Sequence, residues 1–353
     1  MAETTSTWQV RHDDWWLPIY VRRERGRLSR MILTLTPNPS IDATITLKEA
    51  VQPGSVHRAA SVTHVAGGKG VNVTHAVTKA GADSLALLPA APGDHFLALT
   101  AADSIPVHAV EIDGAVRTNT TLTEPGGRTT KLNGPGPTLS EGDQKAIAAA
   151  LAEYAPRAEW LVMAGSLPKG VSADWYTHLI TVAREANPRL HIAVDTSDAP
   201  MVALGENLDT AAPDLIKPNG LELGQLAGVD GEALEAAAEN GDFSGVVEAA
   251  RVVVKRGIPE VLVTLGGAGA ALVTADEAWV ATPPPINVKS TVGAGDSSLS
   301  GYILARRNGA SFADALRQAV AYGSAAASLP GTQLPSPEQL DIDHTAVSAV
   351  SAL

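Results

Sequence analysis

The stretch Thr291–Leu304, TVGAGDSSLSGYIL, combines residue types that could carry out a reaction. Gly293, Ala294 and Gly295 stand directly before Asp296, and a run of small and apolar residues follows, which predicts the start of a helix. Backbone N–H groups crowded at such a helix start form a site for anions. Asp296 could be a general base that removes a proton from a hydroxyl as this attacks phosphorus, or it could be an N-terminal helix cap.

Asp42 is a second candidate, because it follows a short apolar run. Met31–Thr36, MILTLT, has the pattern of a buried strand, and Asp42 comes soon after it in TPNPSIDATITL. Ligands of open α/β sheets bind at the carboxyl ends of the strands. Asp42 could therefore accept hydrogen bonds from the hydroxyls of a polyol, or it could cap a turn.

A glycine-rich turn in AGGKGVNVTHAVTKAGA leads into a predicted helix over 71–80. Gly68 belongs to the turn, and Lys69 and Asn72 would lie at the start of the helix. The Walker pattern GxxxxGK[ST] is absent, so a nucleotide P-loop is excluded. The turn suits an anionic group on a small ligand, and the alternative is a plain surface lysine.

Arg117 lies in a stretch of strand-like alternation, 107–132, which has a hairpin turn at 125–127. A period of two places Arg117 and Asn119 on the same face. The guanidinium is suited to a forked contact with phosphate. A solvated arginine on an edge strand is the competing interpretation.

Two loops after predicted strands carry further polar residues. Ser166 lies in AGSLPKGV, and Lys217 opens KPNGLEL, in which Asn219 and Glu222 are three positions apart. That spacing puts the last two on one face of a helix's first turn. They could organise a hydrated Mg²⁺ near phosphates, or they could form an N-x-x-E capping pair.

Thr264 precedes a tight glycine turn, GGAGAALV, in which Gly266 and Gly269 could admit a nucleotide against bare backbone. The dinucleotide fingerprint G-x-G-x-x-G is missing, which counts against an NAD-binding fold. A final apolar helix, Phe312–Leu329, is rich in small residues. These would let either a flat ring or another helix pack closely.

Strands and helices alternate between these motifs, which predicts a mostly parallel sheet with right-handed crossovers. The predicted strands are 83–88, 160–163, 191–194, 215–216 and 260–265, and the predicted helices are 93–102, 140–155 and 172–187. Two strand-rich segments, 43–65 and 107–132, would together form a small separate sheet that acts as a lid. The C-terminal segment 335–353 is expected to be surface helix or loop.

Composition narrows the class of protein. The 353 residues carry a net charge of −12 and no basic run beyond 22–27, which argues against nucleic acid as a partner. No run of 18 apolar residues is present, so we expect no membrane span. The absence of cysteine excludes disulfides and thiolate metal sites. Residues 1–30 lack the pattern of a secretory signal, so we expect an N-terminal extension outside the fold and a cytoplasmic protein.

Eight motifs in order, TPNPSID, GGKGVNV, VRTN, NGPGP, GSLPKGV, KPNGLEL, VTLGGAGA and TVGAGDS, give the chain a family resemblance from Met31 to Leu340. It resembles the ribokinase/PfkB carbohydrate kinases, most of all their branch of 1-phosphofructokinases and tagatose-6-phosphate kinases. The resemblance implies a ribokinase-like three-layer α/β domain over 31–340, with a mostly parallel sheet flanked by helices and a small β-sheet lid. Residues 341–353 would then be a C-terminal tail.

The resemblance also implies a role for each matching residue. Asp296 would be the catalytic base, next to an anion hole of Gly293, Ala294 and Gly295. The residues that would bind the sugar phosphate are Asp42, Gly68, Lys69, Asn72, Arg117 and Ser166. The residues that would bind the nucleotide are Lys217, Asn219, Glu222, Thr264, Gly266 and Gly269, with Glu222 holding Mg²⁺ through water.

The activity implied is ATP-dependent phosphorylation of a ketohexose phosphate, with fructose 1-phosphate giving fructose 1,6-bisphosphate, in a homodimer that pairs through its lids. The alternatives are tagatose 6-phosphate or fructose 6-phosphate as acceptor, and a non-catalytic sugar-phosphate sensor. The chain departs from the branch at Gly134, where an acidic residue is usual, and at Asp198, where glycine is frequent. Ser298–Ser300 is also less bulky than usual, so the acceptor stays open.

Overall fold

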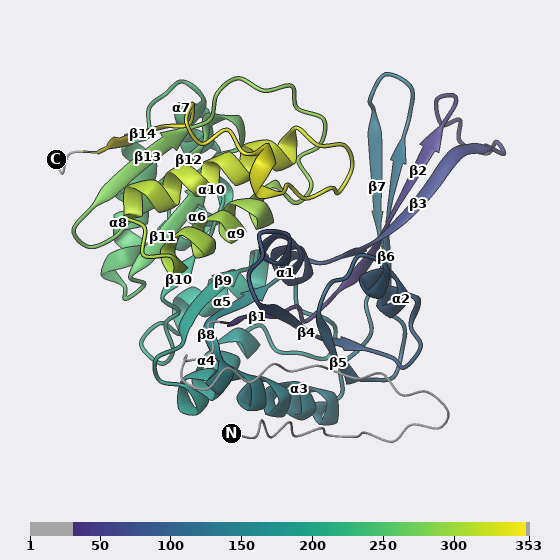
Figure 1. Cartoon of the computed structure of the whole chain (residues 1–353), viewed down its shortest axis with the longest axis horizontal. Helices are drawn as coiled ribbons and strands as arrows, with labels where there is room; N and C mark the ends of the chain where they lie inside the picture. Colours follow the sequence, from purple (N-terminus) through teal and green to yellow (C-terminus); the bar gives the residue numbers. More distant parts are fainter. Residues whose placement is uncertain (1–30, 351–353) are drawn as a thin grey trace, which may run out of the picture.

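The computed structural model describes residues 31–350 (Figure 1). The predicted extension, 1–30, lies outside the described residues. Within them, a large sheet covered by helices on both faces forms the body, and a second, smaller sheet stands away from it. The predicted fold class, a mostly parallel α/β sheet with a small additional sheet, is confirmed.

The large sheet has ten strands in the order β14-β13-β12-β11-β10-β9-β8-β1-β4-β5. Neighbours from β5 to β11 are parallel, and β12, β13 and β14 are added antiparallel. The strands are β1 Met31–Leu35, β4 Ser84–Ala90, β5 Val107–Glu111, β8 Ala158–Ala164, β9 His191–Asp195, β10 Leu215–Ile216, β11 Glu260–Thr264, β12 Ala270–Val273, β13 Ala278–Thr282 and β14 Ala346–Ala349.

Strand β1 lies where the order of strands reverses. The chain adds β4 and β5 on one side of β1, and then adds β8, β9, β10 and β11 on the other. All these strands point the same way, so their carboxyl ends meet at one edge of the sheet. A crevice for ligands is expected at such a reversal.

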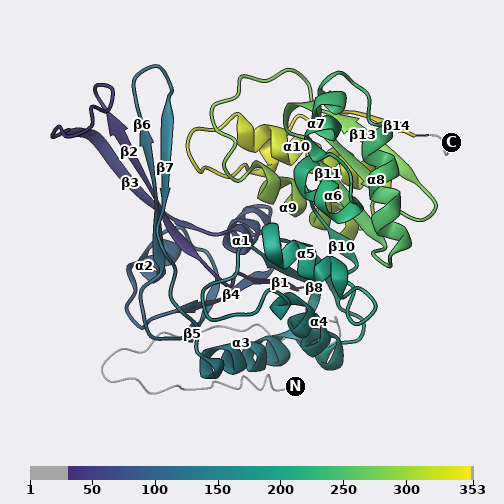
Figure 2. The same ribbon diagram turned by 180° about the vertical axis from the view of Figure 1, so that it is seen from behind.

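Helices cover both faces of the large sheet (Figures 1 and 2). Buried side chains of β1 show why: Ile32 packs on one face with Val73 and Leu299, and Leu33 packs on the other with Ile147. A strand buried on both faces reads as a continuous apolar run, as MILTL does. The helices are α1 Lys69–Lys79, α2 His95–Ala102, α3 Glu141–Tyr154, α4 Trp175–Ala186, α5 Asp198–Glu206, α6 Gly220–Ala227, α7 Gly231–Glu239, α8 Ser244–Lys255, α9 Ala294–Arg307 and α10 Phe312–Ala327.

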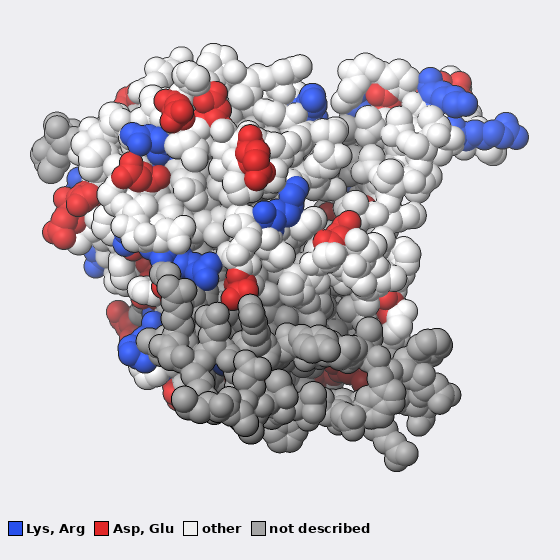
Figure 3. All heavy atoms as spheres, in the orientation of Figure 1, with Lys and Arg blue, Asp and Glu red and all other residues white. Residues whose placement is uncertain are grey.

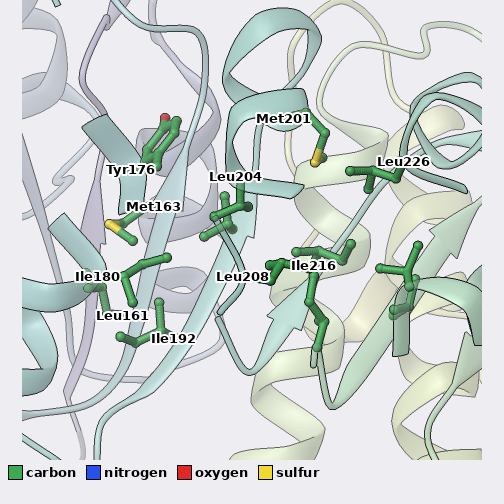
Figure 4. Close-up of a cluster of buried hydrophobic side chains, with 14 of the residues drawn as sticks. Leu161, Met163, Tyr176, Ile180, Ile192, Met201, Leu204, Leu208, Ile216 and Leu226 are labelled. Carbon is green, nitrogen blue, oxygen red and sulfur yellow. The ribbon is translucent and has the colours of Figure 1, made fainter. Parts of the chain in front are cut away.

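A cluster of buried side chains holds β8, β9 and β10 against α4, α5 and α6 (Figure 4). Leu161, Ile192 and Ile216 are fully buried from three adjacent strands, and Ile180 and Leu204 cover them from the helices. Each such side chain contributes about 1.5–3 kcal/mol when it leaves water. These strands therefore form a firm base for the residues at their carboxyl ends.

The small sheet has the order β3-β2-β6-β7, with β2 Ser40–Leu47, β3 Ala59–Gly67, β6 Arg117–Thr123 and β7 Thr129–Asn133. Two distant parts of the chain build it, as predicted, and β6 and β7 form the predicted hairpin. The predicted boundary at 107 is wrong, however. Strand β5 pairs with β4 in the large sheet, so the second part of the small sheet begins at Arg117.

The two faces of the small sheet differ in character. Asp42 and Asn119 are cross-strand partners on one face. Ile45 pairs with both Val62 and Leu122 on the other face, which is apolar. On this apolar face Val62 keeps 50% of its surface exposed.

The C-terminal segment differs from its prediction. Residues 346–349 form β14, which pairs with β13 at the edge of the large sheet, and Val347 packs onto the core below. The fold therefore continues past Leu340 to the end of β14 at Ala349, and residues 341–349 are not merely a tail. A strand of four residues has too weak a pattern of its own, and the open edge of β13 decides its conformation.

The surface carries charges of both signs. On the face drawn in Figure 3, lysine and arginine side chains are scattered among acidic ones over the part of the chain that the structure describes. The same view shows a notch between the small sheet and the body. Among the described residues, no helix is both long enough and apolar enough to cross a membrane.

Candidate active site

Helix α9 begins where the glycine-rich motif predicted a helix start. Gly293 is its N-cap residue in a left-handed conformation, with φ 77°, and no side chain caps this end. The first backbone N–H groups of the helix are thus left without a capping side chain. Asp296 lies in the first turn and does not cap the helix. The capping interpretation of Asp296 is therefore wrong.

The Asp296 carboxylate is held from α1. Asn72 Nδ2 donates a hydrogen bond of 2.8 Å to Asp296 Oδ2, and the side chain is only 7% exposed. Burial and the nearby Asp195 carboxylate raise the pKa of Asp296 to about 6, although Lys69 and Lys217 oppose the rise. The carboxylate is thus ionised at neutral pH and is still basic enough to accept a proton.

Two lysines meet a single buried carboxylate beside Asp296. Lys69 Nζ lies 2.7 Å from Asp195 Oδ1, and Lys217 Nζ lies 3.1 Å from Asp195 Oδ2. Burial alone would raise the pKa of Asp195, but Lys217 and Lys69 outweigh it and hold that pKa below its ordinary value. The sequence motifs assigned no role to Asp195. Its place at the end of β9, on the ligand-binding edge, was the one signal available.

Lys217 also contacts the start of α9. A β-carbon added at Gly295 would lie 3.2 Å from Lys217 Nζ, so the absence of a side chain lets the ammonium approach this helix turn. Lys217 is buried, whereas the side chain of Lys69 keeps 36% of its surface exposed. A positive charge and a helix N-terminus therefore converge beside Asp296.

Asn219 and Glu222 form a reciprocal capping box at the start of α6. Glu222 N donates to Asn219 Oδ1 at 2.7 Å, and Asn219 N donates to Glu222 Oε2 at 2.9 Å. The capping alternative is thus confirmed. Burial raises the pKa of the Glu222 carboxyl, and the charges of Lys69, Asp195 and Lys217 all act on it. The Glu222 carboxylate therefore caps helix α6 and also interacts electrostatically with Lys69, Asp195 and Lys217.

The glycine turn after β11 lies next to that capping box. Thr264 forms a parallel bridge with Asn219, and its N–H donates to Pro218 O at 3.0 Å. Gly266 and Gly269 are both left-handed, with φ 55° and 109°. Nothing lies within 4 Å of the position that a Gly266 side chain would occupy, so its surface is open to a ligand.

Asp42 lies near the start of β2, on the face of the small sheet that also carries Asn119. Its Oδ1 accepts hydrogen bonds from Ser40 Oγ at 2.8 Å and from Asn119 Nδ2 at 3.3 Å. Burial raises the pKa of Asp42. Its other oxygen fills the space that a side chain at Gly67 would need. Gly68, with φ 117°, then leads straight into Lys69 and helix α1.

Arg117 reaches from the small sheet toward the loop after β8. One of its Nη atoms donates to Asn38 O at 3.2 Å and to Ser166 Oγ at 3.4 Å, and its Nε is buried without a partner. Burial lowers the pKa of this guanidinium. Ser166 itself is exposed. Arg117 thus lies at the base of the small sheet, between that sheet and the loop after β8.

The structure thus gathers the predicted residues into two neighbouring groups. The inner group, around Asp296, contains Asn72, Lys69 and Lys217 together with the unpredicted Asp195. The outer group, on the small sheet and β8 loop, contains Asp42, Arg117 and Ser166. Gly68 joins the two along the chain. Thr264, Gly266 and Gly269 lie beyond Asn219, on the far side of the inner group.

A cavity of about 220 Å³ lies beside α10. Pro284, Pro285 and Ile286 form one wall, and the small residues Ala321 and Ser324 form another. Close packing of two helices, one of the two predicted alternatives for the small residues, is confirmed, since a side chain at Gly323 would overlap with Ser298 of α9. Among residues 31–350, no group of three or more histidine or acidic side chains could hold a metal alone.

Comparison with known proteins identifies the family. The model of the pfkB family of carbohydrate kinases matches residues 35–339. The 1-phosphofructokinases of Rhodobacter capsulatus and Haloferax volcanii are each 36% identical to this chain, over 88% and 91% of it and over 94% and 99% of their own lengths. The crystal structure of Escherichia coli phosphofructokinase-2 in complex with fructose-6-phosphate has a TM-score of 0.74 and 30% identity, covering 86% of this chain and 96% of that one.

These matches extend over most of the chain, so the protein is a carbohydrate kinase. It belongs to the PfkB family.

Proposed function

We propose that the protein transfers the γ-phosphoryl group of ATP to fructose 1-phosphate and forms fructose 1,6-bisphosphate. The observation that carries this proposal is the buried Asp296 at an uncapped helix start, beside Lys217. The identity to the 1-phosphofructokinases of two organisms favours the acceptor.

Asp296 accepts the proton of the attacking sugar hydroxyl. Its pKa of about 6 leaves it ionised at neutral pH, and Asn72 fixes its orientation. The backbone from Gly293 to Gly295 and the ammonium of Lys217 stabilise negative charge on the transferred phosphoryl group. Phosphoryl transfer depends mostly on such positioning and electrostatic stabilisation.

The nucleotide binds along the turn after β11 and the start of α6. Thr264 and the open backbone of Gly266 leave room for its phosphates and ribose, and the 220 Å³ cavity beside α10 receives the adenine ring. Gly269 contributes differently from its prediction, because its backbone packs against Ala281 O and so shapes the turn. Asn219 and Glu222 lie between these features and the inner group.

Mg²⁺ fits the same region as a hydrated ion. Among the described residues Glu222 supplies a single carboxylate, which suits a cation that keeps several waters and takes its other ligands from phosphates. When bound, Mg²⁺ would neutralise charge on the phosphates of ATP.

The sugar phosphate binds between the small sheet and β1. Asp42 accepts hydrogen bonds from sugar hydroxyls, and Arg117 binds the phosphate with support from Ser166. Gly68 and Lys69 line the passage to Asp296. The small sheet acts as a lid, and its closure excludes water that would otherwise hydrolyse ATP.

The first prediction concerns the acceptor. In an ADP-release assay with MgATP, fructose 1-phosphate should give a higher kcat/KM than fructose 6-phosphate or tagatose 6-phosphate. A preference for a 6-phosphate would overturn the acceptor and retain the kinase site. Absence of turnover with all three sugars would favour a non-catalytic sugar-phosphate sensor.

The second prediction concerns the base. Asp296→Asn should lower kcat by roughly 10²–10⁴-fold, the usual contribution of a general base. Since the wild-type base works only when ionised, kcat/KM should fall as the pH drops below about 6, the pKa of Asp296. The variant should lack this acidic limb. Asp143→Asn, in the first turn of α3, is the control and should behave as wild type. Near-normal turnover of Asp296→Asn would contradict the assignment.

The third prediction concerns the phosphate of the sugar. Arg117→Ala should raise the KM for the sugar phosphate about 10- to 100-fold, because a hydrogen bond to a charged group contributes ~1.5–3 kcal/mol. The KM for ATP should change little. Arg128→Ala removes another arginine of the same hairpin, one paired with Glu124, and should leave both constants unchanged. If only the KM for ATP rose, Arg117 would be misplaced.

The fourth prediction concerns a homodimer through the lids. The apolar face around Val62 and the edge strands β3 and β7 would be covered by a second copy. Val62→Asp should therefore sediment as a monomer at concentrations where wild type is a dimer. Val202→Asp, at a valine of α5 that is 42% exposed, is the matched control and should remain dimeric. A dimeric Val62→Asp would rule out this interface.

A further inference from the structure

Asp195 is the one charged residue in the inner group whose side chain is completely buried. Its carboxylate is 1% exposed, and each of its oxygens faces a different lysine, Lys69 at 2.7 Å and Lys217 at 3.1 Å. Burial opposes the charge of this carboxylate, and the two lysines outweigh that effect and lower its pKa.

The backbone around Asp195 is fixed on both sides. Ala164 of β8 is its strand partner, and Gly165 N donates to Asp195 O at 2.9 Å. On the other side, Lys217 N donates to Val194 O at 3.2 Å. Asp195 therefore ends a central strand that both neighbours hold in place, and its side chain has little freedom.

The two lysines that pair with Asp195 lie on different sides of the site. Lys69 opens α1, one turn before Asn72, which binds Asp296. Lys217 lies against Gly295 at the start of α9. One lysine thus faces the passage for the sugar, and the other faces the place of the transferred phosphoryl group.

We propose that Asp195 is a positioning residue for phosphoryl transfer, which holds Lys69 on the acceptor side and Lys217 on the donor side of Asp296. The proposal rests on the proposed kinase function for its catalytic part. Asp195 touches neither reactant; it acts through the two ammonium groups.

The charge of Asp195 also acts on the pKa of Asp296. The charged groups facing Asp296 are Asp195 from β9, Lys69 from α1 and Lys217 from the loop after β10. The charges of Lys69, Asp195 and Lys217 also act on Glu222 of α6. Helix α10 contacts α9 through Tyr322 and Gln318 at Gly301 and through Gly323 at Ser298. Removal of the Asp195 charge therefore leaves Asp296 facing two uncompensated cations, which favour its ionised form.

The test compares Asp195→Asn with Asp214→Asn. Asp214 precedes β10 at the opposite end of the strands, where it is paired with Arg184 at 2.6 Å. Asp195→Asn should lower kcat/KM roughly 10- to 100-fold, the size of effect expected when a hydrogen bond to a charged group is lost. It should also move the acidic limb of the pH profile to lower pH by roughly one pH unit, the effect expected when a nearby like charge is lost. Asp214→Asn should melt earlier than wild type and keep the wild-type limb.

Two further variants separate charge from folding. Lys217→Met should move the limb the other way, to higher pH, since it removes a cation from Asp296. The double variant Asp195→Asn/Lys217→Met removes one charge of each sign, so its limb should lie near that of wild type. This variant avoids an unpaired buried ammonium and serves where Asp195→Asn does not fold.

A measurement that needs no catalytic turnover tests the role of Asp195 independently of the proposed function. The ¹³C signal of the Asp296 carboxyl, assigned by its loss in Asp296→Asn, should titrate at lower pH in Asp195→Asn than in wild type. If this shift occurs and no sugar is phosphorylated by wild type, the proposed function fails and the electrostatic role of Asp195 stands. If the signal and the limb stay in place in Asp195→Asn, and in the double variant kcat/KM equals that of wild type, the inference is overturned.

Discussion

The carboxylates and lysines at the carboxyl edge of the large sheet depend on one another's charge. An isolated ion in this position would cost several kcal/mol of desolvation, and loss of one partner from a buried pair destabilises by ~3–5 kcal/mol. Asp195 stays ionised because Lys69 and Lys217 flank it. Asp296, which has no lysine of its own, instead has a raised pKa. One set of contacts thus produces both a stable ion cluster and a carboxyl group with a raised pKa.

The two sheets that carry the site residues differ in how deeply their strands are buried. Strands β8, β9 and β10 are buried on both faces, so the residues at their ends cannot shift without disturbing the core (Figure 4). The small sheet is buried mainly at its base, where Ile41 and Ala66 join a smaller core cluster, and most residues of β3 beyond that base are exposed. Asp42 and Arg117 therefore lie on the element with fewer buried contacts. Elements of low local stability are the ones that move when ligands bind.

The sequence predicted the residues that belong to local motifs and missed those defined by neighbours in space. The helix start before Asp296 and the capping box at Asn219 follow from short-range spacing. Asp195 has no motif of its own, and its role arises from lysines far along the chain. Alternation alone likewise could not show that β5 joins β4, or that β14 covers the edge of β13, because pairing partners are decided by the assembled sheet.

The structure bears on two departures from the family pattern, at Gly134 and Asp198. A side chain at Gly134 would overlap with the backbone of Thr118, which gives a reason for glycine in this chain. The left-handed φ of 55° at Asp198 explains why glycine is frequent there, and nothing in the structure explains the aspartate.

The balance of charges in the site adds a further requirement. The site's basic side chains are Lys69, Lys217 and Arg117, and its carboxylates are Asp42, Asp195, Asp296 and Glu222. These cations do not outnumber the carboxylates. The uncapped start of α9 supplies only partial charge, so an additional cation would favour the proposed binding of two phosphorylated substrates here. This balance is the physical argument for the proposed Mg²⁺ beside Glu222.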